Sequence, residues 1–486
     1  MKRALLLAAA LIACGKHSGT VLDPGGVAGD PGSGSGGSSG SGSGGSVGTG
    51  FAGAGPWGAG NRQYDSDSGI LEQPVVGAST DEAQNLWVAT NAALYLLKPG
   101  QTTFKRYAAA AGLHLPGNAV TYCDSNFAGG DKKCPISGAA ASPGISEITG
   151  GSAGEVFVGY YGLDDGSADW GDPNRHSGKL DRVRLQADGS LKVDRIDFVS
   201  SDTPEFWHNR TVQRLLYDHF QHAHELYVGT NHGVDRILPD KLRAPAQGEW
   251  FLKAYAEYVS DHLHPQVCYH HACDASESDL RLGDWKGLAL SKDGNLWVAG
   301  RWTAGQIRWT ASLNDWLARP GDQIFSIAFG DGYVKGKCNS EGFCNQPVFM
   351  VDAEGDVISA QAAAVAPDGK VWFASGKTTS QDVPRGLAVW DPAARNFRYF
   401  DPVLDAGMVE RDLRDLVALP DGRLVLAGAT SGLTFWDPAT GRHVAVSGSA
   451  FMPDDHVFRL ELDQMVSPPT LYVSTWGGVA ALRKLP

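Results

Sequence analysis

The sequence predicts an all-β chain that folds as a seven-bladed β-propeller of four-stranded antiparallel blades, and three observations carry this prediction. A short apolar strand recurs seven times along the 486 residues, and a strand that begins with glycine follows each copy. Asp-Gly turns recur between strands as well. The large central residues of the apolar strands are spaced 70, 70, 70, 75, 53 and 47 residues apart, at Trp87, Phe157, Tyr227, Trp297, Trp372, Val425 and Tyr472. Repetition at this period is typical of an array of small sheets, whose commonest closed form is a propeller.

The first segment, residues 1–13, is expected to be a lipoprotein signal peptide. Two cations precede a ten-residue apolar run in MKRALLLAAALIAC, which is the pattern of an export signal and is too short to span a bilayer as a helix. The residues before Cys14 resemble a bacterial lipobox, in which the cysteine is lipidated and becomes the mature N-terminus. The alternative is a plain signal peptide with a chance cysteine.

Residues 14–60 are predicted to be a lipid-anchored flexible linker, and residues 61–486 one propeller. The linker is dominated by Gly and Ser, so it cannot bury enough apolar surface to offset the entropy of ordering. A globular head on a lipid-anchored tether indicates a protein of the bacterial cell envelope. We expect it to be extracytoplasmic, at the outer membrane or the periplasmic face.

A complete repeat can be divided into strands a to d within residues 412–446. Strand a is expected at 413–419, strand b after the turn Pro420-Asp421-Gly422, strand c at 432–437 and strand d at 442–446. Glycine supplies the positive φ that the tight turn needs. The last repeat reaches only strand c, at 478–484. Residues 62–67 or 70–75 are therefore expected to supply its fourth strand and to close the ring.

The remaining six cysteines form three close pairs, which predict disulfides in an exported chain: Cys123 and Cys134, Cys268 and Cys273, Cys338 and Cys344. All lie in long d–a insertions, expected at 109–144, 200–210, 259–284 and 320–359. In a four-stranded meander the b–c and d–a connections emerge on one face, here called the loop face. The a–b turns lie on the opposite turn face. Long stapled loops usually carry binding function, although insertions stabilised only for survival outside the cell are the alternative.

Residues of the b–c loops and of the starts of the a strands should approach the central channel. Aromatic side chains mixed with Arg, His and Asp suit a polar or sugar-like ligand, or a protein loop. Several of them could instead cap blades. The predicted ligand-binding residues are Tyr160, Tyr161, Trp207, His208, Arg210, His232, Asp284, Trp285, Arg301, Trp302, Asp455, His456 and Trp476.

Three polar groups invite a metal hypothesis. His262, His264, His270 and His271 surround Cys268 and Cys273, but a disulfide there removes two ligands. His219, His222 and His224 lie in an a–b turn, where surface exposure explains them equally well. Asp164, Asp165, Asp169 and Asp172 lack the spacing of an EF-hand. No haem-attachment or HExxH motif occurs, so the sequence predicts no metal and no cofactor.

The repeats resemble the ligand-binding propeller repeats in the sensor regions of hybrid two-component regulators. The matching stretches are Gly112–Asn118, then NLWVAT, DGNLWVAG, DGKVWFAS, ELYVGTNHGVDRI and STWGGVAAL, across most of residues 75–486. The resemblance implies a propeller and a tendency to bind ligands. The sensor role is not carried over, because no transmembrane helix, kinase or DNA-binding module follows the repeats.

The function expected is therefore binding of a small molecule or an envelope protein by a monomeric propeller that contacts the bilayer only through Cys14. A net charge of −13 without a basic cluster excludes nucleic acid as a partner. One alternative is a metal-assisted hydrolase or lyase at the channel mouth, by fold-level analogy with propeller lactonases and antibiotic-opening lyases. Its candidates would be His208, His232, His456, Asp284 and Asp455. Another alternative is a structural component of the envelope.

Overall fold

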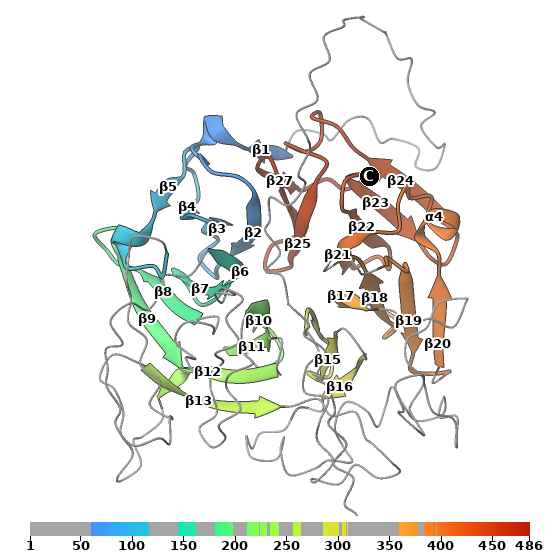
Figure 1. The fold of residues 1–486 in the computed structure, drawn as a ribbon, viewed down its shortest axis with the longest axis horizontal. Coiled ribbons are helices and arrows are strands. Elements are labelled where there is room, and N and C mark those ends of the chain that lie inside the picture. Colours follow the sequence, from blue (N-terminus) through green and yellow to red (C-terminus); the bar gives the residue numbers. More distant parts are fainter. Residues whose placement is uncertain are drawn as a thin grey trace, which may run out of the picture.

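The computed structural model describes residues 60–115, 144–161, 180–197, 211–222, 224–230, 234–242, 256–263, 285–300, 304–307, 309, 359–377, 383–394 and 396–486. These residues form seven antiparallel blades around one axis, which confirms the predicted all-β propeller (Figure 1). Within these ranges, helical structure is limited to η1 (Ser66–Ser68), η2 (Ala109–Ala111) and α4 (Pro402–Asp405). No helix in the described ranges is long and apolar enough to cross a membrane.

The strands follow the predicted order in each blade. The inner strands a of blades 1 to 7 are β2 (Val75–Thr80), β6 (Ile145–Gly150), β10 (Val212–Asp218), β14 (Gly287–Leu290), β17 (Ala360–Val365), β21 (Leu413–Ala418) and β25 (Val457–Asp463). Strands b are β3 (Leu86–Thr90), β7 (Glu155–Tyr160), β11 (Glu225–Thr230), β15 (Leu296–Ala299), β18 (Val371–Ser375), β22 (Leu424–Gly428) and β26 (Thr470–Thr475).

Strands c and d complete the blades. Strands c are β4 (Leu94–Leu97), β8 (Leu180–Leu185), β12 (Val234–Leu242), β16 (Ala304–Ile307), β19 (Leu387–Asp391), β23 (Leu433–Asp437) and β27 (Val479–Leu482). The described outer strands d are β5 (Lys105–Tyr107), β9 (Leu191–Asp197), β13 (Ala256–Leu263), β20 (Asn396–Phe400), β24 (Arg442–Val446) and β1 (Arg62–Tyr64).

The ring closes between the two ends of the described chain. β1 pairs antiparallel with β27, with Arg62 opposite Ala481 and Tyr64 opposite Val479, so blade 7 takes its outer strand from the N-terminal side. Of the two segments predicted for this role, 62–67 is therefore correct. The segment 70–75 is not, because Ile70 packs in the core and Val75 begins β2. This pairing covers the edge of β27 and completes blade 7 with four strands.

The seven repeats are explained by where the core lies. Seven clusters of buried side chains occur, and each fills the gap between one pair of neighbouring blades. The large central residue of each strand b contributes to a different cluster: Trp87, Phe157, Tyr227, Trp297, Trp372, Val425 and Tyr472. The repeat therefore records one packing position used once at every blade interface.

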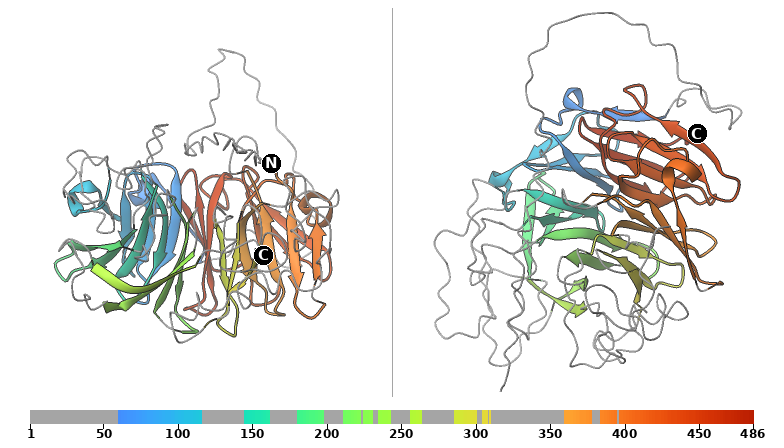
Figure 2. Two further views of the ribbon diagram at one scale, coloured as in Figure 1. Left: turned by 60° about the horizontal axis from the view of Figure 1, so that its bottom comes forward. Right: turned by 45° about the vertical axis from the view of Figure 1, so that its right-hand side comes forward.

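Strand direction places the connections on two faces, as Figure 2 shows from the side. Because neighbouring strands are antiparallel, strands a and c end at the turn face and strands b and d end at the loop face. The a–b turns are tight. Gly294, Gly369 and Gly422 take φ values of +77°, +85° and +91°, as the Asp-Gly signal predicts. In blade 3, His224 occupies the corresponding position with φ +67°.

Blades 2 and 3 are joined at their outer edges, a feature that the sequence did not predict. Ala256 and Glu257 of β13 pair in parallel with Ile196 and Asp197 of β9, so the two blades share one eight-stranded sheet. The insertion predicted at 259–284 is also wrong at its start, because β13 runs to Leu263.

Candidate functional site

Six of the thirteen predicted ligand-binding residues lie in the described ranges: Tyr160, Tyr161, Trp285, Asp455, His456 and Trp476. The other seven lie outside those ranges, namely Trp207, His208, Arg210, His232, Asp284, Arg301 and Trp302. Cys14, the six paired cysteines, the His262–His271 group and the Asp164–Asp172 group also lie outside them.

Two of the six residues are buried between blades. Tyr160 is fully buried, its hydroxyl donates to Asp181 Oδ2 at 2.7 Å, and its ring meets His114 edge-to-face. Trp285 is 1% exposed and packs in the core between blades 3 and 4. These contacts favour a packing role for both side chains. The neighbouring Tyr161 forms a bridge to Thr211, and burial raises the pKa of its phenol to about 12.

The other three residues meet at the loop face of blade 7. His456 is exposed, and its Nδ1 lies 2.7 Å from Asp454 Oδ1. The backbone N–H of Trp476 donates to the His456 carbonyl at 3.0 Å, and the Trp476 ring lies 6.2 Å from that of Phe458. The carbonyl of Asp455 accepts from Gly432 N at 2.9 Å, which ties this turn to blade 6. An aromatic ring, an imidazole and carboxylates are thus held together on the face predicted to bind.

A second group, here called the axial charge cluster, consists of Glu147, Arg214, Asp415, Arg459 and Glu461. Arg214 Nη1 of blade 3 donates to Asp415 Oδ2 of blade 6 at 3.1 Å. Arg459 of blade 7 pairs with Glu147 of blade 2 and lies 3.7 Å from Asp415. Blades 3 and 6, and blades 2 and 7, are not neighbours in the ring. These contacts therefore reach across the axis of the propeller.

The inner strands position this cluster by a repeated irregularity. A register shift of one residue falls between the first and third residues of β6, β10, β21 and β25. Such bulges re-aim a side chain locally. The third residues of these strands are Glu147, Arg214, Asp415 and Arg459. Each follows directly on a d–a connection, so the cluster lies near the loop-face end of the axis.

Glu461 is the member that forms no direct ion pair with the other residues that the structure describes. Ser79 Oγ of blade 1 donates to its Oε1 at 3.2 Å. Burial, partly opposed by Arg214 and by the Ser79 hydrogen bond, raises the pKa of this carboxyl to about 7. Burial also lowers the pKa of the Arg459 guanidinium to about 10, which leaves it charged at neutral pH. The cluster can therefore exchange a proton near neutral pH.

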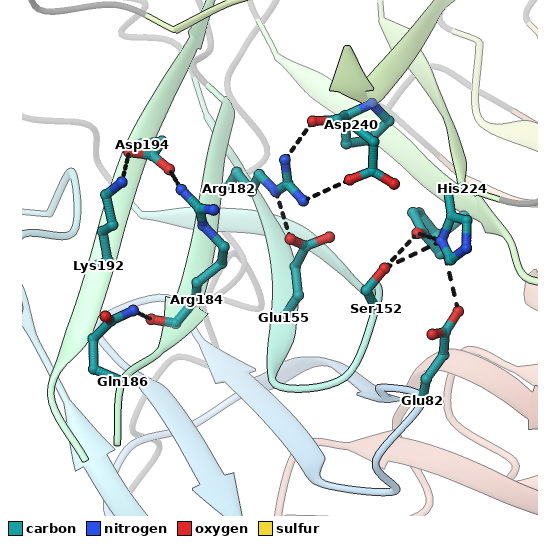
Figure 3. Close-up of polar contacts among 12 residues, drawn as sticks. Glu82, Ser152, Glu155, Arg182, Arg184, Gln186, Lys192, Asp194, His224 and Asp240 are labelled. Atoms are coloured by element: carbon teal, nitrogen blue, oxygen red, sulfur yellow. Dashed lines mark hydrogen bonds and ion pairs between the residues drawn. The ribbon is translucent and has the colours of Figure 1, made fainter. Parts of the chain in front are cut away.

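The histidines of blade 3 lie in the β10–β11 turn, on the turn face as predicted, but they do not point one way. His222 stacks on Trp309 at 3.7 Å. His224 Nδ1 instead lies 2.6 Å from Tyr217 Oη and 3.1 Å from Ser152 Oγ, with Glu82 3.8 Å away (Figure 3). Burial lowers the pKa of His219, which contacts Glu82 at 3.4 Å.

This arrangement does not support the chemistry of a metal or of a triad. No group of three His, Cys, Asp or Glu residues in the described part of the chain could hold a metal ion. Ser152 and Glu82 approach the same nitrogen of His224, whereas a general base needs its two partners on opposite nitrogens. The turn-face group therefore acts as a contact between blades 1, 2 and 3.

Sequence reasoning missed the axial charge cluster although a signal was present. In each of these four strands the third residue is charged and apolar residues follow it, as in ISEI, VQRLL, LRDLV and VFRL. Four charges of alternating sign at one repeated position indicate a polar axis. Their partners could not be assigned, because Arg214 and Asp415 are 201 residues apart.

No protein-family model matches the sequence, and no curated protein matches it. Several solved structures match the fold with a TM-score of 0.45. One is the extracellular domain of a hybrid two-component system from B. thetaiotaomicron, with 14% identity over 87% of this chain; the chain spans 41% of that structure. A chain of the mitotic checkpoint complex has 11% identity over 87% of this chain and 94% of its own. The structure of YCF48 bound to D1 peptide has 12% identity, and the match covers 88% of this chain and 97% of that one. At these identities the likeness does not extend to what those proteins bind.

Proposed function

We propose that this chain is an extracytoplasmic propeller, held to a membrane by a lipid on Cys14, that binds a small molecule or a protein partner through its loop face. The carrying observation is the asymmetry of the connections. β5 ends at Tyr107 and β6 begins at Ile145, and β13 ends at Leu263 while β14 begins at Gly287, so two connections from a strand d to the next strand a are long. By contrast, β22 begins six residues after the end of β21. Long segments on a rigid scaffold are where binding function concentrates.

The described part of the loop face suits this role. Trp476 and Phe458 supply partly exposed aromatic surface, and His456 and Asp454 supply polar groups beside it. A few polar groups around an aromatic platform fix the orientation of a bound molecule. Of the predicted ligand-binding residues, His456, Asp455 and Trp476 form the described part of the proposed site. Trp207, His208, Arg210, His232, Asp284, Arg301 and Trp302 remain proposed members.

Site-specific photo-crosslinking in intact cells tests the choice of face. A photoreactive phenylalanine at position 476 should give a discrete adduct with a partner or ligand. The matched control is position 220 on the turn face, where Phe220 is 60% exposed. Adducts of equal yield at 220, or none at 476 and at the neighbouring position 456, would contradict the assignment of the loop face.

The lipid anchor has a separate test. Cys14→Ser should release the protein from the membrane fraction, because one residue carries the proposed acyl attachment. A variant that stayed membrane-bound would refute the anchor and would leave the binding face untouched.

The three proposed disulfides are tested by peptide mapping of the mature protein without reduction. We expect linked peptides that join Cys123 to Cys134, Cys268 to Cys273 and Cys338 to Cys344. Free thiols at these positions would show that the loops are not stapled.

A further inference from the structure

The two arginines of the axial charge cluster have more hydrogen-bond donors than the cluster uses. A guanidinium carries five N–H donors. Among the described residues, Arg214 makes one side-chain hydrogen bond, to Asp415. Arg459 contacts Glu147, Asp415 and the Gln213 carbonyl, yet its buried Nε has no partner there. Unused charged donors in a partly dry site favour an oxygen-rich acceptor.

In each ion pair of the cluster the cation is the more exposed partner, and the half-buried Glu461 lies nearby. The side chains of Arg214 and Arg459 are 11% and 15% exposed, whereas those of Asp415 and Glu147 are 0% and 3% exposed. The two carboxylates thus lie behind the guanidiniums and hold them in place. The two guanidiniums are therefore partly accessible at the axis, although the whole chain has a net charge of −13.

The position in the strands gives the direction of approach. Arg214 and Arg459 are the third residues of β10 and β25, and both strands begin at the loop face. Gln213, which lies between Val212 and Arg214, is at the bulge of β10 and has no side-chain hydrogen bond in the described part of the chain. The two guanidiniums therefore lie close to the loop-face end of the axis.

We propose that Arg214 and Arg459 bind a carboxylate group at the axis, which makes an acidic molecule the ligand class of the loop face. This proposal rests on the function proposed above, because it names the chemistry of that same face. A carboxylate offers two acceptor oxygens that match the planar donor fork of a guanidinium.

Binding of an anion should be coupled to a proton on Glu461. Without a ligand, the two arginines face Glu147 and Asp415, and Glu461 is an additional carboxyl group. Glu461 lies near Ser79 of β2, Arg214 of β10, Asp415 of β21, and Arg459 and Asp463 of its own strand. An added carboxylate is repelled by ionised Glu461 and accepted beside the neutral acid. Since burial raises the pKa of Glu461 to about 7, the coupling falls near neutral pH.

The test is a calorimetric titration of the full-length purified protein with sodium acetate, at constant ionic strength and at pH about 6 and about 8. If acetate binds only when Glu461 is protonated, its affinity should be about tenfold higher at the lower pH. Arg214→Gln should weaken binding at least about tenfold. The matched control is Arg442→Gln, an exposed arginine of β24, which should leave the affinity unchanged.

Two results would overturn the proposal. One is acetate binding that never saturates or that Arg442→Gln weakens as much as Arg214→Gln. The other is a variant Glu461→Gln that keeps the pH dependence, whereas we expect the affinity at pH about 8 to rise to the value at pH about 6. If Arg214→Gln does not fold, Glu461→Gln alone still decides. A negative titration together with a loop-face crosslink at position 476 would refute the carboxylate site and retain the binding face.

Discussion

Two sets of buried ion pairs in this propeller differ in how completely their hydrogen bonds are used. In blade 3, the side chains of Arg236 and Glu225 are 2% and 5% exposed, and Arg236 Nε donates to Glu225 Oε2 at 2.9 Å. Tyr227 donates to the same carboxylate at 2.7 Å, and Trp309 Nε1 donates at 3.2 Å while its ring lies 5.4 Å from the guanidinium. Blade 2 repeats the pattern with Arg182 and Glu155, where Arg182 also bonds to Asp240 at 3.2 Å (Figure 3).

The axial charge cluster uses the same residue types with fewer partners. Its members come from four different blades, its guanidiniums stay partly exposed, and most donors of Arg214 are unused among the described residues. The difference indicates that saturation by neighbours, and not burial alone, separates a structural pair inside a blade from one that can still take up a proton or a ligand.

Arg236→Met gives the largest expected effect. It leaves the buried carboxyl of Glu225 without its cation, which costs about 3–5 kcal/mol in the free energy of unfolding. Urea denaturation of the purified protein measures the loss. Arg442→Met, at an exposed position, should change the same quantity by less than about 0.5 kcal/mol. A cost below about 1 kcal/mol for Arg236→Met would contradict the claim that the saturated Arg236–Glu225 pair stabilises the fold.

Asp415→Asn should destabilise the protein less. Asp415 is fully buried and accepts from Arg214 at 3.1 Å and from Leu460 N at 3.0 Å. The amide keeps one acceptor oxygen, and both arginines retain access to water, so we expect a cost of about 1–3 kcal/mol. The same urea measurement applies. A cost larger than that of Arg236→Met would show that the axis, and not the blade interior, carries the saturated network.

Glu461→Gln separates the two regions by pH. The folded pKa of Glu461, about 7, is above its ordinary value of 4.5, so the folded protein holds a proton that the unfolded chain has released. The stability of the native protein therefore falls as pH rises from about 4.5 to 7. The variant should be more stable by roughly 1–3 kcal/mol at pH about 8 and equal at pH about 4.5. If the free energies of unfolding of the native protein and of Glu461→Gln change with pH in the same way, Glu461 does not bind a proton near neutral pH.

The sequence contained most of the fold because each blade interface repeats one apolar position. Trp87 and its six counterparts had to recur once in every blade to fill seven equivalent gaps, and the count of strands in the last repeat predicted that blade 7 lacks one. The outer strands carry no such constraint. β13 is polar along much of AEYVSDHL and lies at the blade edge, so neither its extent nor its pairing with β9 could be predicted.

The candidate site was less predictable for a physical reason. Tyr160 and Trp285 have the residue types of a binding surface, but the same large rings also fill blade interfaces, and only packing distinguishes the two uses. The axial charges are the opposite case, because they were not predicted as a site although the structure brings them together. Glu147 and Arg459 interact across the axis, so ring closure must be known before either charge acquires a partner.

His224 gives the smallest expected effect and tests a position where a turn departs from its repeat. Gly154 and Gly294 occupy the equivalent positions with φ +77°, whereas His224 holds φ +67°. His224→Gly relieves about 1 kcal/mol of backbone strain and loses contacts with Tyr217 and Ser152 that are worth about as much. The net change should stay within about 1 kcal/mol by thermal unfolding. His224→Val loses the same contacts and keeps the strain with a β-branched side chain, so it should cost about 2 kcal/mol more. Equal stabilities for the two variants would show that the turn relaxes and that the positive φ at this position carries no measurable strain.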